Sequence, residues 1–128
     1  MREIPIIKVG TTLIAVVHED ITDQDALEFQ EDLNTRIERF GATGVLIDVT
    51  LVATIDSFLG RLLHEIAVGA RLLGAYTVVA GMQPAVAMTL VELGLGLDGV
   101  RTTLTPERGL QLLQRNAKAG RETLRRGH

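Results

Sequence analysis

Short β-branched apolar runs alternate along this sequence with longer segments in which apolar residues recur every three or four positions. The first two runs, residues 4–9 and 12–17, are separated by Gly10-Thr11, and this pattern predicts a β-hairpin. Thr22 then predicts the N-cap of a helix, with Asp25 completing a capping box. The buried face of that helix should consist of Ala26, Phe29, Leu33, Ile37 and Phe40.

Further apolar runs predict three more strands, at residues 44–49 (GVLIDV), 76–80 and 100–104. Because strands and helices alternate after the hairpin, we expect an α/β fold with a mixed sheet of four to five strands covered by about four helices. A chain of 128 residues fits one domain. We assign this domain to residues 1–118 and expect residues 119–128 to form a basic, flexible tail.

Three more helices are predicted in the second half of the chain. Asp56 should cap the first, Pro84 suits the first turn of the second, and Thr105 precedes the third. The buried face of the first of these should consist of Leu59, Leu63, Ile66, Ala70 and Leu73. The apolar positions of the other two are Ala87, Leu90, Val91, Leu93, Leu110 and Leu113.

Composition excludes several classes of protein. The chain has no cysteine, so disulfides, thiol chemistry and thiolate metal sites are excluded. A net charge of −3 argues against general nucleic-acid binding, which depends on a basic surface. No apolar run approaches the roughly 20 residues that cross a membrane, and the N-terminus does not resemble a signal peptide. We therefore expect a soluble, cytoplasmic protein that binds neither nucleic acid nor membrane.

The catalytic and metal-binding patterns are weak. Ser57 and His64 lie seven residues apart on one predicted helix, about 10 Å along its axis, which is too far for a nucleophile and its base. Residues 94–99 match G-x-G-x-x-G, but they follow a helix and precede a strand, the reverse of a dinucleotide-binding loop. His18, His64 and His128 are scattered, so we expect no metal, no cofactor and no catalytic residue.

Ser57 is the residue most indicative of function. It is the only serine in the chain, and it takes the first helical position after Asp56. This helix start should lie near the carboxyl ends of the strands, where open α/β sheets usually have their functional surface. We expect Ser57 to lie on an outward ridge with Gly60, Arg61, His64 and Val68, where Gly60 would allow a partner to approach closely. Serine is also common near helix N-termini, so the pattern alone leaves a purely structural role open.

At this segment the chain resembles the STAS domain family of sulfate transporters and anti-sigma factor antagonists. The resemblance extends over about residues 3–117 and includes the order of the elements, the GVLIDV strand and the Asp56-Ser57 pair. The sequence Asp56-Ser57-Phe58-Leu59-Gly60-Arg61 departs from the D-S-S-G or D-S-x-G of simple anti-anti-sigma factors. It is similar to the RsbS type of stressosome antagonist.

The resemblance implies that Ser57 is phosphorylated by an RsbT-type serine/threonine switch kinase, which is sequestered until that modification releases it. It also implies RsbR-like co-antagonists, a resetting RsbX-type phosphatase and assembly into a homo-oligomer or a large hetero-oligomer. The protein would then regulate a stress response and would not be an enzyme. We expect the partner-binding surface to consist of Ile55, Asp56, Phe58, Gly60, Arg61 and His64.

Two alternatives remain at this point. One is a simple anti-anti-sigma factor that binds an anti-sigma kinase. The other is an α/β domain that binds a small ligand, or an enzyme, with Asp48 and the helix start at Gln83-Pro84 as its site. An aspartate at the end of a strand more often fixes a loop than performs catalysis.

Overall fold

The computed structural model describes residues 4–97 and 100–126 and contains five strands and four helices in these ranges. Their order is β1 (Ile6–Val9), β2 (Thr12–Val16), α1 (Asp23–Phe40), β3 (Gly44–Asp48), α2 (Ser57–Leu72), β4 (Tyr76–Ala80), α3 (Pro84–Glu92), β5 (Arg101–Thr103) and α4 (Pro106–Arg126). The predicted α/β fold, with a mixed sheet and four helices, is confirmed. Across the described ranges, no helix is both long and apolar enough to cross a membrane.

The strands form a single sheet in the order β1-β2-β3-β4-β5. The predicted hairpin is confirmed, since β1 pairs antiparallel with β2, and each later pair is parallel. In β3 and β4, Val45 lies beside Thr77 and Ile47 beside Val79. The parallel strands therefore bring the loops that follow β3 and β4 to the same edge of the sheet, which is where α2 and α3 begin.

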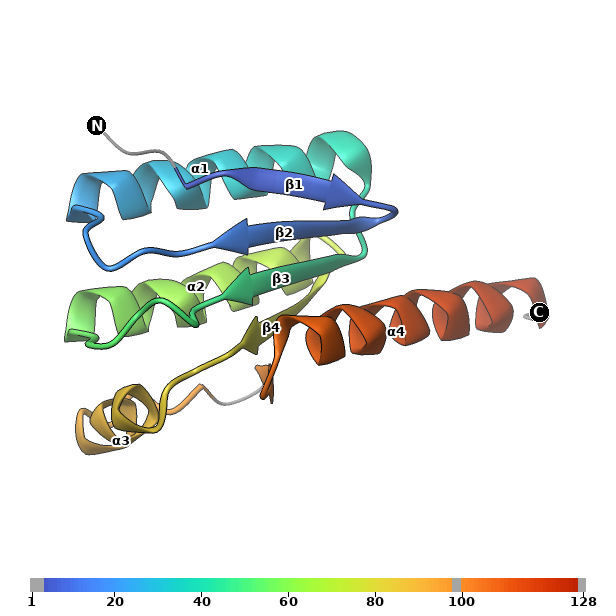
Figure 1. The fold of residues 1–128 in the computed structure, drawn as a ribbon. Helices are drawn as coiled ribbons and strands as arrows, with labels where there is room; N and C mark the ends of the chain where they lie inside the picture. Colours follow the sequence, from blue (N-terminus) through green and yellow to red (C-terminus); the bar gives the residue numbers. More distant parts are fainter. Residues whose placement is uncertain (1–3, 98–99, 127–128) are drawn as a thin grey trace.

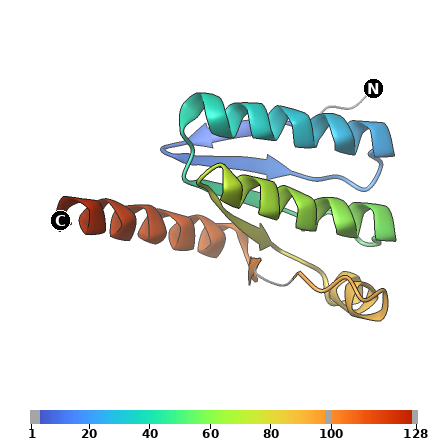
Figure 2. The same cartoon turned by 180° about the vertical axis from the view of Figure 1, so that it is seen from behind.

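The helices cover both faces of the sheet. Figures 1 and 2 show α1 and α2 side by side on one face and α4 on the other, while α3 lies beyond the end of β4. Residue type explains why the central strand is buried on both sides. In β3 the consecutive residues Val45, Leu46 and Ile47 are all at most 1 % exposed, as expected for a parallel strand between two helical layers.

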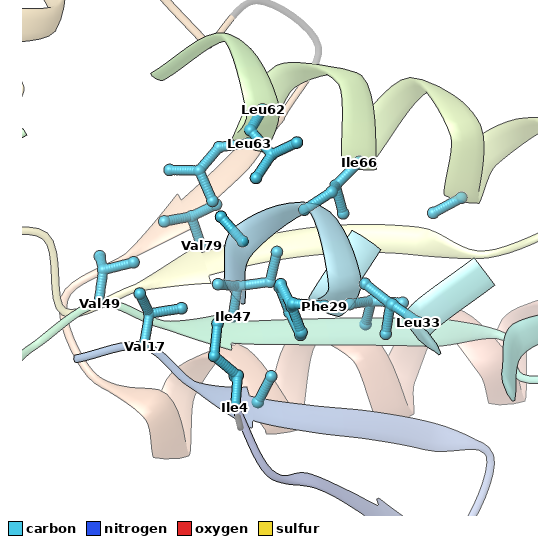
Figure 3. Close-up of a cluster of buried hydrophobic side chains, with 14 of the residues drawn as sticks. Ile4, Val17, Phe29, Leu33, Ile47, Val49, Leu62, Leu63, Ile66 and Val79 are labelled. Atoms are coloured by element: carbon cyan, nitrogen blue, oxygen red, sulfur yellow. The ribbon is translucent and has the colours of Figure 1, made fainter. Parts of the chain in front are cut away.

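The larger core lies between the sheet and the pair α1 and α2. Figure 3 shows Phe29 and Leu33 from α1 and Leu63 and Ile66 from α2 pointing towards Ile47 of the sheet. The capping box predicted at Thr22 is confirmed, because the Asp25 backbone N–H donates to Thr22 Oγ1 (3.0 Å) and the Thr22 N–H donates to Asp25 Oδ2 (3.0 Å). Local capping and a three-to-four spacing thus suffice to place α1.

The smaller core lies under α4. Leu113 contributes the buried side chain from α4, and it packs with Leu46, Val78 and Ala80 of the sheet. Gly109 allows this helix to lie close to the sheet, since a Cβ at that position would come within 2.6 Å of Leu46 Cδ1. The helix crosses the sheet from β5 towards the first residue of β3, Gly44, where a Cβ would lie 3.1 Å from Leu113 Cδ2.

The periodicity overestimates burial at the ends of two helices. Phe40 and Leu73 are expected on buried faces, but their side chains are 42 % and 43 % exposed. They lie at the last position of α1 and just after α2, so the helices pass the limit of the core there. Phe40 instead lies beneath cations, with Lys8 Nζ 5.4 Å from its ring centroid.

The last helix is longer than the sequence pattern indicates. The sequence predicts a flexible tail from residue 119, yet the backbone of α4 is helical to Arg126. The range 119–126 of the predicted tail is therefore an extension of α4. His128, and residues 98 and 99 of the G-x-G-x-x-G match, lie outside the described residues.

Candidate functional site

The candidate site lies at the edge of the sheet where the parallel strands end, and its base is a braced pair of loops. Asp48, the last residue of β3, accepts hydrogen bonds at Oδ1 from the Thr50 N–H (2.9 Å) and the Thr50 hydroxyl (2.5 Å). Gln83 Nε2, from the loop before α3, donates to the Thr50 carbonyl (3.0 Å). Asp48 therefore fixes the loop, and these contacts do not favour its alternative role in a ligand site at Gln83-Pro84.

Gly81 completes this brace. Its φ is +77°, a left-handed conformation that glycine adopts without steric cost. A Cβ at Gly81 would collide with the side chain of Thr50 and would lie 3.3 Å from Asp48 Oδ1. The side chain of Thr50, in the loop after β3, thus packs against the backbone of Gly81, in the loop after β4. Only glycine leaves room for this contact.

A second contact ties the loop before α2 to the segment before α1. Glu19 Oε1 accepts a hydrogen bond from the Ala53 N–H (2.5 Å) across 34 residues of sequence. Within the same loop Val52 is 1 % exposed, whereas Leu51 is 53 % exposed. Val52 therefore anchors the loop in the core, while the apolar side chain of Leu51, just before it, is exposed to solvent.

Ser57 is placed at the start of α2 by the cap that the sequence predicts. The Asp56 side chain accepts at Oδ1 from the Leu59 N–H (2.9 Å), and the Asp56 carbonyl accepts from the Gly60 N–H (3.1 Å). Ser57 is the first residue of α2 and is half-buried. Within the described part of the chain, no hydrogen-bond partner is found for its hydroxyl, which is therefore available to a reactant.

A first hollow of about 350 Å³ lies between the starts of α1 and α2. Phe58, Ile55 and Ile21 supply much of its apolar lining, and all three are half-buried. Asp56 and two further acids, Glu19 and Asp23, also line it. Three of the six residues expected to bind a partner, Ile55, Asp56 and Phe58, therefore lie together on this side of Ser57.

A second hollow of about 340 Å³ lies on α2 beyond Ser57. It is lined by Gly60, Arg61 and His64 from α2, with Glu65, and by residues 94–96 after α3. Arg61 and His64 are exposed, as predicted. The remaining three expected partner-binding residues thus lie together. Ser57 lines neither hollow itself, but its chain neighbours Asp56 and Phe58 line the first, and Arg61, one turn further along α2, lines the second.

The expected position of Gly60 on an outward ridge is wrong. Gly60 is buried, because the segment that includes α3 lies against it. A Cβ on Gly60 would come within 2.9 Å of Leu90 Cδ2 and 3.2 Å of Leu95 Cδ1. The close approach that this glycine permits is made by the protein's own chain.

Two contributors to the site were not found from the sequence. Glu19 and Leu95 act through contacts with residues more than 30 positions away, and neither belongs to a recognisable motif. The only sequence signal for Leu95 is its place within the G-x-G-x-x-G match of residues 94–99. In the described ranges, no group of three or more His, Asp or Glu residues is placed to hold a metal ion.

Comparison with known families gives a match to the model of the STAS domain over residues 3–106. Among curated proteins, the RsbT co-antagonist protein RsbRA of Bacillus subtilis is 32 % identical over 91 residues, which cover 71 % of this chain and 33 % of RsbRA. The RsbT co-antagonist protein RsbRC of the same organism is 36 % identical over 64 residues, which cover 48 % of this chain and 23 % of RsbRC. The matched segments are thus a third or less of these relatives.

Solved structures match over most of both chains. A Moorella thermoacetica RsbS variant, in which one serine is replaced by glutamate, has a TM-score of 0.82 and 36 % identity, and the match covers 91 % of this chain and 99 % of that one. A chain in a solved structure of the stressosome, which is described as a signal integration and transduction hub, also matches. Its TM-score is 0.78 and its identity 39 %, and the match covers 88 % of this chain and 98 % of that one.

Proposed function

This chain belongs to the STAS domain family, and from this premise we propose that it is a stressosome antagonist of the RsbS type, controlled by phosphorylation of Ser57. In this proposal it sequesters an RsbT-type serine/threonine switch kinase in the cytoplasm and releases the kinase when Ser57 is phosphorylated. It assembles with RsbR-type proteins into a large complex, and an RsbX-type phosphatase removes the phosphate.

The observation that most supports this function is the position of Ser57 next to residues that line the two hollows. Ser57 is half-buried at the capped start of α2, and its hydroxyl has no hydrogen-bond partner in the described part of the chain. A kinase that seats apolar side chains against Ile55 and Phe58 would bring its active site next to this hydroxyl. The relatives' names agree with the proposal, since they include RsbT co-antagonists and an RsbS in which a serine is replaced by an acidic residue.

Phosphorylation can act as a switch here without unfolding the domain. A phosphoserine adds about −1.5 to −2 charges at pH 7. At a helix N-terminus this charge is stabilised by about 0.3–1 kcal/mol. Arg61, one turn further along α2, is exposed and lies on the same side of the helix. The fold should therefore tolerate the phosphate.

A docked kinase should not tolerate it. The first hollow already includes Glu19, Asp23 and Asp56, so a phosphate at its edge adds charge to an acidic rim. An apolar group of the kinase seated there would have to desolvate that charge. A loss of about 3 kcal/mol in binding free energy weakens the complex more than a hundredfold, which is enough for release.

The direct test is to incubate the purified protein with its cognate switch kinase and ATP and to locate the phosphate by mass spectrometry. We expect phosphate on Ser57 and none on the Ser57→Ala variant. Thr54→Ala is the matched control, because Thr54 also presents an exposed hydroxyl at the first hollow and its loss should leave the modification of Ser57 unchanged.

Binding measurements complete the test. Ser57→Ala should retain the kinase after ATP is added, whereas Ser57→Asp should bind it about a hundredfold more weakly. Unchanged affinity of Ser57→Asp would show that charge does not cause release. Absence of phosphate from Ser57 with an active kinase would reject the proposed function. Phosphorylation without assembly with an RsbR-type protein would instead favour a simple anti-anti-sigma factor.

A further inference from the structure

The second half of α4 extends beyond the body of the domain. Leu113 is the buried residue of α4 that lies against Gly44, at the first position of β3. Thirteen residues of the helix, 114–126, follow it, which corresponds to about 20 Å. Figures 1 and 2 show this part of α4 projecting past the amino ends of the strands, away from the start of α1. We refer to residues 114–126 as the α4 arm.

The α4 arm is strongly basic. Its sequence contains five basic residues and one acidic residue. Arg115 and Lys118 are exposed, and neither has an ion pair with another side chain in the described ranges. Arg115 and Lys118 therefore present two positive charges that no acidic side chain of the described residues pairs with.

A complementary surface lies on α1. Residues 19–32 contain seven acidic residues and no lysine or arginine. Within α1, Asp23, Glu28, Glu31 and Asp32 are exposed, and we refer to these four as the acidic face of α1. Asp32 is paired with Arg36 at 3.1 Å, and Glu28 accepts a hydrogen bond from the Gln24 amide at 3.2 Å. Glu31 has no such side-chain partner within the described residues.

The fold prevents one molecule from joining these two surfaces. α1 packs with α2 on one face of the sheet and α4 covers the other. The acidic face lies in the first half of α1, while the arm leaves the sheet at the opposite end (Figure 1). We propose that the α4 arm docks on the acidic face of α1 in a second copy of this chain.

This contact joins two different surfaces, so each copy offers one arm and one acidic face. Two copies that exchange arms form a closed two-fold dimer, whereas one-way docking builds a ring or an open chain of molecules. The proposal is independent of the kinase, because Ser57 is in neither surface. Since the surfaces are exposed and charged, association should weaken as salt rises.

The test is a charge exchange measured by sedimentation velocity on the full chain. At about 50 mM salt the unmodified protein should self-associate, and at about 500 mM this should weaken. Arg115→Glu/Lys118→Glu and Glu28→Lys/Glu31→Lys should each reduce self-association at least about tenfold. An equal mixture of the two variants should regain association, because the unmodified basic arm of one variant can dock on the unmodified acidic face of the other.

Arg101→Glu/Arg108→Glu is the matched control. It makes the same change of charge at exposed positions of β5 and the first turn of α4, outside the arm, and should leave association unchanged. The proposal is overturned if the unmodified protein stays monomeric at low salt or if reversal of the arm has no effect. It is also overturned if the mixed variants remain monomeric, or if the arm binds a DNA fragment and not a second copy. Unchanged circular dichroism of each variant confirms that its fold is intact.

Discussion

Asp56 has two roles at the start of α2, because its side chain caps the helix and its charge lies next to Ser57. The cap is a single hydrogen bond, in which Oδ1 accepts from the Leu59 N–H at 2.9 Å. An asparagine at this position can accept the same bond without the charge. The two roles can therefore be separated by substitution.

We expect Asp56→Ala to lower the free energy of unfolding by about 1 kcal/mol, because the helix start loses its cap. Asp56→Asn should lower it by no more than a few tenths, since asparagine caps about as well as aspartate. Chemical denaturation of both variants provides the measurement. Equal losses would mean that the carboxylate charge, and not the cap, stabilises this end of α2.

At the scale of elements, the start of α2 is held by its contact with the segment containing α3. Leu90 and Leu95 both approach Gly60, at a point where another residue would bring a Cβ within 2.9 Å of Leu90. Leu90 is 3 % exposed, so it has little room to move aside. The position of α3 beside the start of α2 thus depends on one glycine of α2.

Gly60→Ala should destabilise the protein by about 1–3 kcal/mol through overpacking. Gly69→Ala is the matched change in the same helix, where a Cβ would meet only Asn34 Oδ1 at an ordinary 3.7 Å. It should be neutral or stabilising by up to about 1 kcal/mol, because alanine favours the helix. Thermal unfolding of the two variants measures this difference in stability. A stabilised Gly60→Ala would contradict the close contact between Gly60 and Leu90.

The elements that the sequence predicted correctly depend on local signals. The caps at Thr22 and Asp56 and the proline at the start of α3 each involve residues within one turn. The environment of Gly60 could not be predicted in this way, because Leu90 is 30 positions away and periodicity gives no information on which helices meet. A glycine on a helix looks the same in sequence whether a partner or the protein's own chain covers it.

At the scale of the whole molecule, the domain is complete in its core by Leu113. That residue is 2 % exposed and is the last buried side chain among residues 100–120. The sequence predicted the α/β fold and the place of Ser57, because both follow from the order of the elements. The length of α4 was underestimated, because the regular spacing of apolar residues ends where the helix leaves the sheet. Beyond that point the sequence has no apolar pattern that marks a helix.

Removal of residues 119–128 should leave the melting temperature unchanged to within about 2 °C, because residues 114–120 already contribute no buried side chain. Leu113→Ala, in contrast, should cost about 2–5 kcal/mol by creating a cavity under α4. Calorimetry of both variants tests the boundary of the domain. A large loss of stability on truncation would show that the helix beyond Lys118 supports the fold.

Because α4 covers one face of the sheet, this face stays exposed during synthesis until α4 has been made. Strands β3 and β4 emerge from the ribosome well before residues 106–113, so Leu46 and Val78 remain uncovered while the intervening segments are made. Domains acquire stable structure as units, and exposed apolar surface in an incomplete chain favours aggregation. The nascent protein therefore has a half-covered sheet until Leu113 has been translated, and this interval is when it most needs a chaperone.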